Sequence, residues 1–196
     1  MTAWIRMLTD EEASSTVKEM FDLVRTPHGT VDNVMRVHSL RPHTMKGHVT
    51  LYRSVLHNED NTLPFWFLEV VASYTSFLNR CDYSFSHHFT NARRLIDDDD
   101  KSDAIYASFE AGAPEQVFSG KELAFLNYTA KLTTQVADMD EADFQALKEA
   151  GCEDGEILEV NQVVAYFSYS NRLLNGLGVT TVGDTIGYYK ESNRGD

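Results

Sequence analysis

The stretch from Glu69 to His88 brings together the residue types with which this chain could do chemistry: a carboxylate, a thiol, a hydroxyl and an imidazole. Cys81, Ser84 and His88 follow at spacings of three and four, so one helix would present all three along a single face. A thiol just inside a helix N-terminus lies at the positive end of the helix dipole, which favours the thiolate. The spacing therefore predicts a site with Cys81 as nucleophile and His88 as acid or base.

Glu69 is set in an otherwise apolar run, between Phe67-Leu68 and Val70-Val71. A carboxylate is costly to bury unless it is paired, so this position favours a role in the site. Along one continuous helix, Glu69 and Cys81 would be roughly 18 Å apart. We therefore expect a break between them, capped by Asn79, and two helices packed side by side.

Two neighbours of Cys81 are further candidates for the pocket. Ser84 could hold water or substrate between Cys81 and His88, or it could be an inert helix hydroxyl. Tyr83 could line the pocket, although an aromatic residue here is also typical of simple packing. In the same way, Cys81 itself could be a small buried hydrophobe.

The histidines and acidic runs do not predict a metal site. His87 and His88 are adjacent and cannot readily bind the same ion. His38, His43 and His48 are five residues apart, so they do not share a helix face. The acidic run 97–100 lacks the spaced ligands and the glycine of a calcium loop. We expect neither a metal nor a cofactor.

Composition limits the class of protein. The 196 residues are 42% hydrophobic, with 11 glycines and 4 prolines, which suits helices better than a turn-rich sandwich. The net charge of −13 argues against nucleic acid and anionic membrane surfaces as partners. Two cysteines make no disulfide framework, and we see neither a signal peptide nor an apolar run of transmembrane length. A cytoplasmic location is expected.

Apolar spacing and end signals predict an all-α chain that forms one domain over 1–196, with its core motif at 62–96. Thr9–Glu12 and Ser119–Glu122 have the pattern of capping boxes. Val179–Val182 is the best candidate for a strand, and it is short. The predicted helices are Val17–Val24, Val34–Leu40, His43–Leu56, Leu63–Leu78, Arg80–Ile96, Asp103–Glu110, Leu123–Leu132, Asp140–Ala150 and Glu156–Leu174.

The register of Glu69, Cys81, Ser84 and His88 resembles that of the alkylhydroperoxidase AhpD and carboxymuconolactone decarboxylase superfamily, in its peroxidase-related branch. The resemblance covers most of the chain. The other matching stretches are Gly29–Val37 with Arg41-Pro42, Leu63-Pro64, Asn79–Tyr83, Leu147–Gly151, and Phe167–Leu173 before Leu177–Val179.

The resemblance implies a multi-helix bundle that assembles as a homo-oligomer, commonly a trimer or hexamer. It also implies hydroperoxide reduction through a cysteine pair, or decarboxylation of a lactone acid without a cofactor. Carried over, Glu69 and His88 would be the proton relay and Cys81 the first cysteine. The chain departs from the peroxidase pattern at Ser84, which replaces the second cysteine and cannot form a disulfide. Cys152 could take its place only by folding back to Cys81.

Three functions remain open. The first is a peroxidase that uses the single cysteine Cys81, with a hydroperoxide as substrate and an external thiol as reductant. The second is a lyase or isomerase in which Glu69 and His88 are acid and base on a small carbon acid. The third is a non-catalytic member with a decayed site. We favour an oxidoreductase of the first kind.

Overall fold

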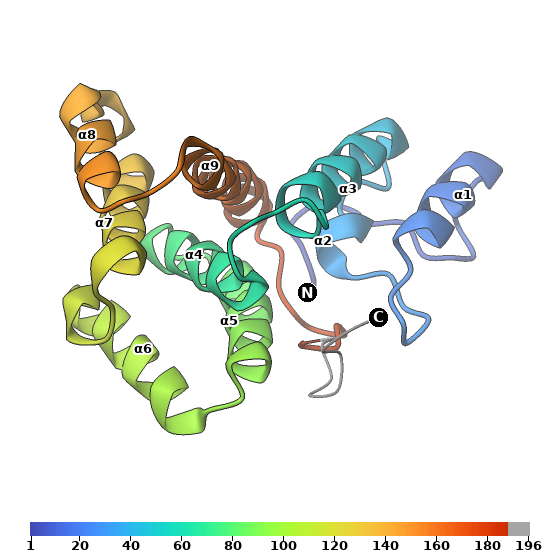
Figure 1. Ribbon diagram of the computed structural model, residues 1–196. Helices are drawn as coiled ribbons and strands as arrows, with labels where there is room; N and C mark the ends of the chain where they lie inside the picture. Colours follow the sequence, from blue (N-terminus) through green and yellow to red (C-terminus); the bar gives the residue numbers. More distant parts are fainter. Residues whose placement is uncertain (188–196) are drawn as a thin grey trace.

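The computed structural model describes residues 1–187, and within this range the chain is helical and contains no strand (Figure 1). The all-α prediction is confirmed, and Val179–Val182 is not a strand. None of the helices in this range is long and apolar enough to cross a bilayer. The helices are α1 (Ser15–Val24), α2 (Asn33–Arg36), α3 (Pro42–Leu56), α4 (Phe65–Leu78), α5 (Asp82–Ile96), α6 (Asp99–Ala111), α7 (Gly120–Thr134), α8 (Glu141–Glu149) and α9 (Asp154–Leu177).

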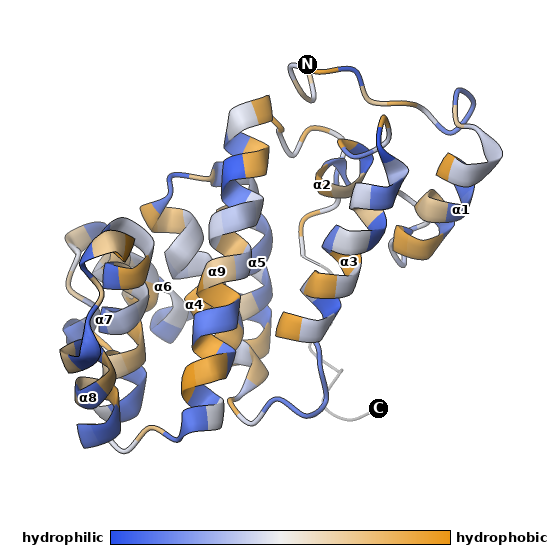
Figure 2. Ribbon diagram, turned by 90° about the horizontal axis from the view of Figure 1, so that it is seen from above, coloured by the Kyte–Doolittle hydropathy of each residue, from blue (hydrophilic) through white to orange (hydrophobic). Residues whose placement is uncertain are grey.

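Helix α4 is the centre of the packing. It lies along α5 and also contacts α7 and α9, while α3 packs on α9 and α1 packs on α3. Figure 2 shows α1 to α3 on one side of α5 and α9, and α6 to α8 on the other. Val70, Val71 and Ala72 of α4 are completely buried, as expected for a helix that is apolar around most of its circumference. A charged residue on this helix therefore needs a partner within the protein.

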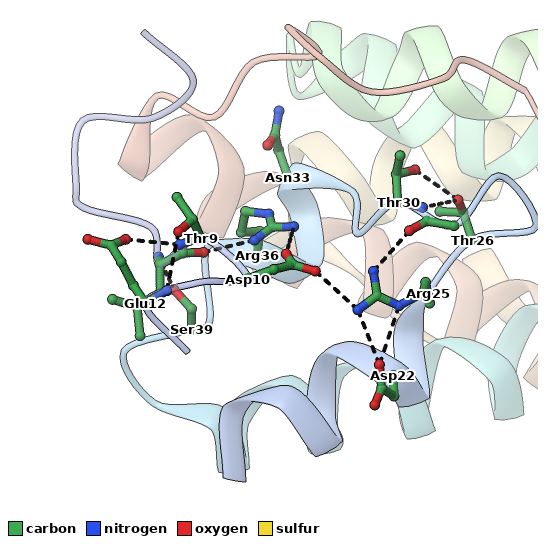
Figure 3. Close-up of polar contacts among 12 residues, drawn as sticks. Thr9, Asp10, Glu12, Asp22, Arg25, Thr26, Thr30, Asn33, Arg36 and Ser39 are labelled. Atoms are coloured by element: carbon green, nitrogen blue, oxygen red, sulfur yellow. Dashed lines mark hydrogen bonds and ion pairs between the residues drawn. The ribbon is translucent and has the colours of Figure 1, made fainter. Parts of the chain in front are cut away.

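A network of polar contacts ties the N-terminal segment to α1 and α2 (Figure 3). Asp10 accepts hydrogen bonds from Arg25 at 3.1 Å and from Arg36 at 2.8 Å. Arg25 also binds Asp22 and the carbonyl of Gly29. These contacts fix the loop after α1, which carries part of the cavity wall described below.

The break between α4 and α5 is present, but Asn79 does not cap α5. Asn79 is the C-cap residue of α4, Arg80 takes a left-handed conformation (φ 51°), and Cys81 occupies the N-cap position of α5. Two asparagines of α9 hold this turn: Asn171 accepts from the Asn79 amide at 3.1 Å, and Asn175 donates to the Asn79 carbonyl at 3.0 Å. The turn therefore depends on a partner helix as well as on its own sequence.

The predicted capping box at Thr9–Glu12 does not start a helix, whereas Ser119 is the N-cap residue of α7, as predicted, but without the hydrogen bonds of a capping box. Thr9 and Glu12 do exchange the two hydrogen bonds of such a box, but they close a separate turn, and α1 begins at Ser15 with Ser14 as its cap. Ser119 makes no capping bond, because Gly120 follows it with a left-handed φ of +55°. Capping boxes occur instead at the starts of α8 and α9.

Candidate active site

Glu69 and His88 face each other across the α4–α5 contact. The carboxylate oxygen Oε2 of Glu69 lies 2.6 Å from Nδ1 of His88, and the Glu69 side chain is completely buried. The other carboxylate oxygen accepts from the Asn91 amide at 3.3 Å. Both oxygens of this buried carboxylate are thus hydrogen-bonded, which offsets part of the cost of burying the charge.

His88 is the member of this pair that reaches open space. It lines a cavity of about 490 Å³, together with Ser84, His87 and Asn91 from α5. Its ring packs edge-on against Phe167, with 4.5 Å between ring centroids. Because Nδ1 is bound by Glu69, Nε2 is the nitrogen with which His88 can exchange a proton with a ligand.

Cys81 lies behind this cavity and does not line it. The residue is 1% exposed and packs with Ala3, Val37 and Leu174. Its thiol points toward the hydroxyl of Ser84, with 3.7 Å between Sγ and Oγ. Ser84 does line the cavity, so its hydroxyl connects the thiol to the open space.

The expectation that a helix N-terminus favours the thiolate at Cys81 is wrong. Burial raises the pKa of the Cys81 thiol above its usual value, and hydrogen bonds from Ser84 and Asn171 only partly oppose this effect. A thiol without solvent is therefore held in its neutral form, although α5 begins at the next residue. Cys152 lies in a different hydrophobic cluster, at the connection between α8 and α9, and both cysteines are free.

Tyr83 lines the cavity, and its hydroxyl is fully used in hydrogen bonds. It lies 2.5 Å from Oδ2 of Asp184 and accepts from the backbone N–H of Val34 at 3.0 Å. Burial, reinforced by the Asp184 charge, raises the pKa of Tyr83. The residue thus joins α5 to α2 and to the segment after α9, in addition to forming part of the wall.

Sequence spacing did not predict the remaining polar wall of the cavity. His48 and Tyr52 come from α3, and Tyr166 and Ser170 come from α9. His38 and His48 share no helix face, as predicted, yet their rings are 4.9 Å apart because His38 lies before α3 and the chain folds back. Only the alternation of apolar and polar residues along α3 and α9 could have indicated these positions. Among residues 1–187, no group of three or more metal-ligating side chains converges.

Neither protein-family models nor curated proteins match this sequence. Solved structures do match it. A peroxidase-related protein with an AhpD core from Ralstonia eutropha JMP134 has a TM-score of 0.78 at 21% identity, covering 92% of this chain and 93% of that chain. A second, from Silicibacter sp. TM1040, has a TM-score of 0.77 at 20% identity, with 91% of each chain covered.

A third similar structure has a different activity in its name. It is a cysteine-to-alanine variant of the debrominase Bmp8 in complex with 2,3,4-tribromopyrrole, with a TM-score of 0.73, 18% identity and 92% of each chain covered. These likenesses extend over almost the whole chain. They confirm the fold that the register of the motif implied, and they leave the reaction open.

Proposed function

We propose that this chain, which has the AhpD-like fold, is an enzyme that moves a proton on a small organic substrate, with His88 as the acid–base group. The observation that carries the proposal is the buried Glu69 carboxylate, 2.6 Å from Nδ1 of a histidine that lines the cavity. A carboxylate in this position holds the imidazole in one tautomer and stabilises the imidazolium that forms during proton transfer.

The reaction begins at a carbon next to a carbonyl group. Nε2 of His88 takes the proton from this carbon, and the electron pair of the broken C–H bond moves onto the carbonyl oxygen to give an enolate. Returning the proton to a different carbon makes the enzyme an isomerase.

The cavity supports a substrate of modest size. A volume of about 490 Å³ lies in the range of sites for small molecules. The tribromopyrrole that is bound by the similar debrominase is a planar ring of this size class. We therefore expect a compact, planar organic substrate.

The same dyad could serve a single-cysteine peroxidase, and the contact between Cys81 and Ser84 is the observation in favour of it. The Cys81 sulfur would attack the outer oxygen of a hydroperoxide while the thiol proton passes by way of Ser84 to His88. The O–O bond breaks, Cys81 becomes a sulfenic acid, and His88 gives the proton to the departing alcohol. An external thiol would condense with the sulfenic acid, with loss of water, and a second thiol would release Cys81 from the mixed disulfide. This is the second candidate, because Cys81 is buried and its pKa is raised.

Exchange of carbon-bound protons tests the first proposal. The probe is acetylacetone in D₂O, with loss of its CH₂ signal followed by NMR. We expect exchange above the buffer background for the wild type, loss of at least about 100-fold of that excess in His88→Gln, and a change of less than about threefold in Cys81→Ser. Equal exchange in the wild type and His88→Gln would contradict the proposal.

Sulfenate formation tests the second candidate on the same samples. One equivalent of cumene hydroperoxide is added, and Cys81 is probed with a sulfenate-specific reagent and mass spectrometry, with Cys152 as the internal reference. We expect modification of Cys81 no faster than that of Cys152. Rapid modification of Cys81 that is lost in His88→Gln would instead establish the peroxidase.

A further inference from the structure

A second polar pair lies in the same cavity, at a place that the proton transfer does not use. The hydroxyl of Tyr166 on α9 lies 2.8 Å from Nε2 of His48 on α3, and both residues line the cavity. Ser170, one turn further along α9, lines it too and hydrogen-bonds Tyr166. The two elements thus present hydroxyl and imidazole groups at one spot.

This pair is buried and uncharged. His48 is 2% exposed and Tyr166 is 4% exposed. Burial lowers the pKa of His48 to about 3, with a smaller contribution from His38, and burial raises the pKa of Tyr166. Nδ1 of His48 is buried without a hydrogen-bond partner. A neutral imidazole whose Nδ1 has no partner can carry its proton on Nε2 and donate it to the Tyr166 oxygen, which leaves the Tyr166 hydroxyl free to donate to a ligand in the cavity.

Two aromatic rings connect this pair to the Glu69–His88 dyad. The ring of Tyr52 lies 6.2 Å from that of His88 and 5.7 Å from that of Tyr166. The ring of Phe167 lies 4.5 Å from that of His88 and 5.0 Å from that of Tyr166. A planar molecule that packs on these rings has a polar group of the protein within reach at each end.

The charges around the cavity do not suit an anionic ligand. The one arginine or lysine that lines the cavity, Arg53, is exposed at the rim and donates to the carbonyl of Leu23. Burial lowers the pKa of His57 to about 4, and a protonated His88 is already paired with Glu69. Inside, burial lowers the pKa of His87 to about 4, so that this imidazole is neutral. The carboxylate of Asp32 also lines the cavity, and the chain carries a net charge of −13. An anion would lose its hydration without finding a buried cation.

We propose that His48 and Tyr166 are the second anchor of the substrate, and that the substrate is an uncharged planar molecule whose carbonyl or hydroxyl group binds there. This inference rests on the proposed function only in assuming that the other end of the molecule meets His88. The anchor orients the substrate, and the dyad moves its proton. Specificity then depends on α3 and α9, whereas the chemistry depends on α4 and α5.

Matched probes test the anchor by titration calorimetry. Acetophenone and ethylbenzene have nearly the same shape and differ in the carbonyl group, while benzoate and benzylammonium add a negative and a positive charge. We expect the wild type to bind acetophenone about fivefold to tenfold more tightly than ethylbenzene, which corresponds to one hydrogen bond, and to bind both charged probes more weakly than acetophenone.

The variants assign that preference to the pair. Tyr166→Phe should reduce the preference for acetophenone to about onefold and leave the affinity for ethylbenzene unchanged. His48→Gln, a second variant in case the first does not fold, should reduce it as well. Tyr169→Phe is the matched control, because Tyr169 is on the same helix but is exposed and does not line the cavity. It should keep the preference.

Three results would overturn the anchor: equal binding of acetophenone and ethylbenzene by the wild type, tighter binding of either charged probe, or an intact preference in both variants. Repeating the titration with His88→Gln separates this inference from the proposed function. We expect His88→Gln to lose proton exchange and to keep the preference for acetophenone over ethylbenzene. Exchange without any preference refutes only the anchor, and preference without wild-type exchange refutes only the reaction.

Discussion

The contact between Glu69 and His88 joins a completely buried carboxylate to the imidazole that compensates its charge. A completely buried carboxylate is stable only because His88 and Asn91 replace its water. The pair is thus a structural requirement as well as a candidate catalytic group. Loss of activity on substitution will be informative only if stability is measured beside it.

A double-mutant cycle measures this linkage. We expect His88→Gln to cost about 3–5 kcal/mol of unfolding free energy, because it leaves the carboxylate poorly paired. Glu69→Gln should cost about 1–3 kcal/mol, because an amide can still hydrogen-bond. The double variant should be less destabilised than the sum, with a coupling of about 1–3 kcal/mol. Urea denaturation followed by circular dichroism gives all four values, and strict additivity would contradict a coupled pair.

Among the elements, the segment after α9 has a fixed place because of Asp184. Its carboxylate binds the Tyr83 hydroxyl and accepts from the backbone N–H of Asn33, and it lies 3.8 Å from Nε2 of His87. At this distance the two groups would form an ion pair if both were charged. However, burial raises the pKa of Asp184 to about 6 and lowers that of His87 to about 4, so between these values both groups are neutral. We read the contact as neutral in that range.

The raised pKa gives a signed prediction for this segment. The folded state binds the Asp184 proton more tightly than the unfolded chain, whose value is 3.8. Its contribution to stability is therefore complete below about pH 4 and is lost as pH rises through about 6. Asp184→Asn should remove this loss, so that the difference in unfolding free energy between variant and wild type changes in favour of the variant from pH 4 to pH 7. Urea melts at four pH values measure it, and a constant difference would contradict the assignment.

The elements also show what could be predicted from sequence. Helical periodicity located the nine α-helices of residues 1–187 to within a few residues in most cases, because apolar faces recur at helical spacing. The turn at Arg80 was expected only in outline. Its geometry depends on Asn171 and Asn175, which are more than 90 residues away along the chain. Local sequence contains no signal for such partners.

At the candidate site, contacts within one motif could be predicted from the sequence, whereas contacts between distant parts of the chain could not. The face shared by Ser84 and His88 follows from helix geometry, and the need for a partner to Glu69 follows from the cost of a buried charge. The burial of Cys81 depends on Ala3 and Leu174, residues from opposite ends of the chain, so a thiolate was wrongly expected. His48 and Tyr166 join the cavity for the same reason.

For the molecule as a whole, assembly and the extent of the domain stay predictions. We expect a homo-oligomer, a trimer or hexamer, and a single domain over 1–196. Large apolar side chains such as Trp4 and Leu158 are exposed on this chain, at 71% and 59%. Exposed apolar residues are common on monomers, so they do not by themselves indicate an oligomer. Sedimentation of the purified protein would measure the number of subunits.

Buried histidines give the whole molecule a defined response to acid. Burial lowers the pKa of His48 to about 3 and that of His87 to about 4, and it also lowers the pKa of His38. In each case the unfolded chain, with an ordinary value of 6.5, binds the proton more tightly. Stability is therefore complete above about pH 6.5 and is lost as pH falls toward 4, with a slope of up to about 1.4 kcal/mol per pH unit for each histidine. Asp184 acts in the opposite direction, but it is one carboxyl group against three imidazoles. We therefore expect a net loss of stability on acidification.

Unfolding free energies from urea melts between pH 4 and pH 7 test this balance. We expect the wild type to lose stability steadily on acidification and His87→Gln to lose it less steeply, because one protonation no longer competes with folding. His43→Gln is the matched control: His43 is exposed, and its substitution should leave the slope unchanged. A wild-type profile that is flat from pH 6.5 to 4, or equal slopes in all three proteins, would mean that the imidazoles around the cavity are already hydrated. An anionic substrate would then become compatible with the cavity.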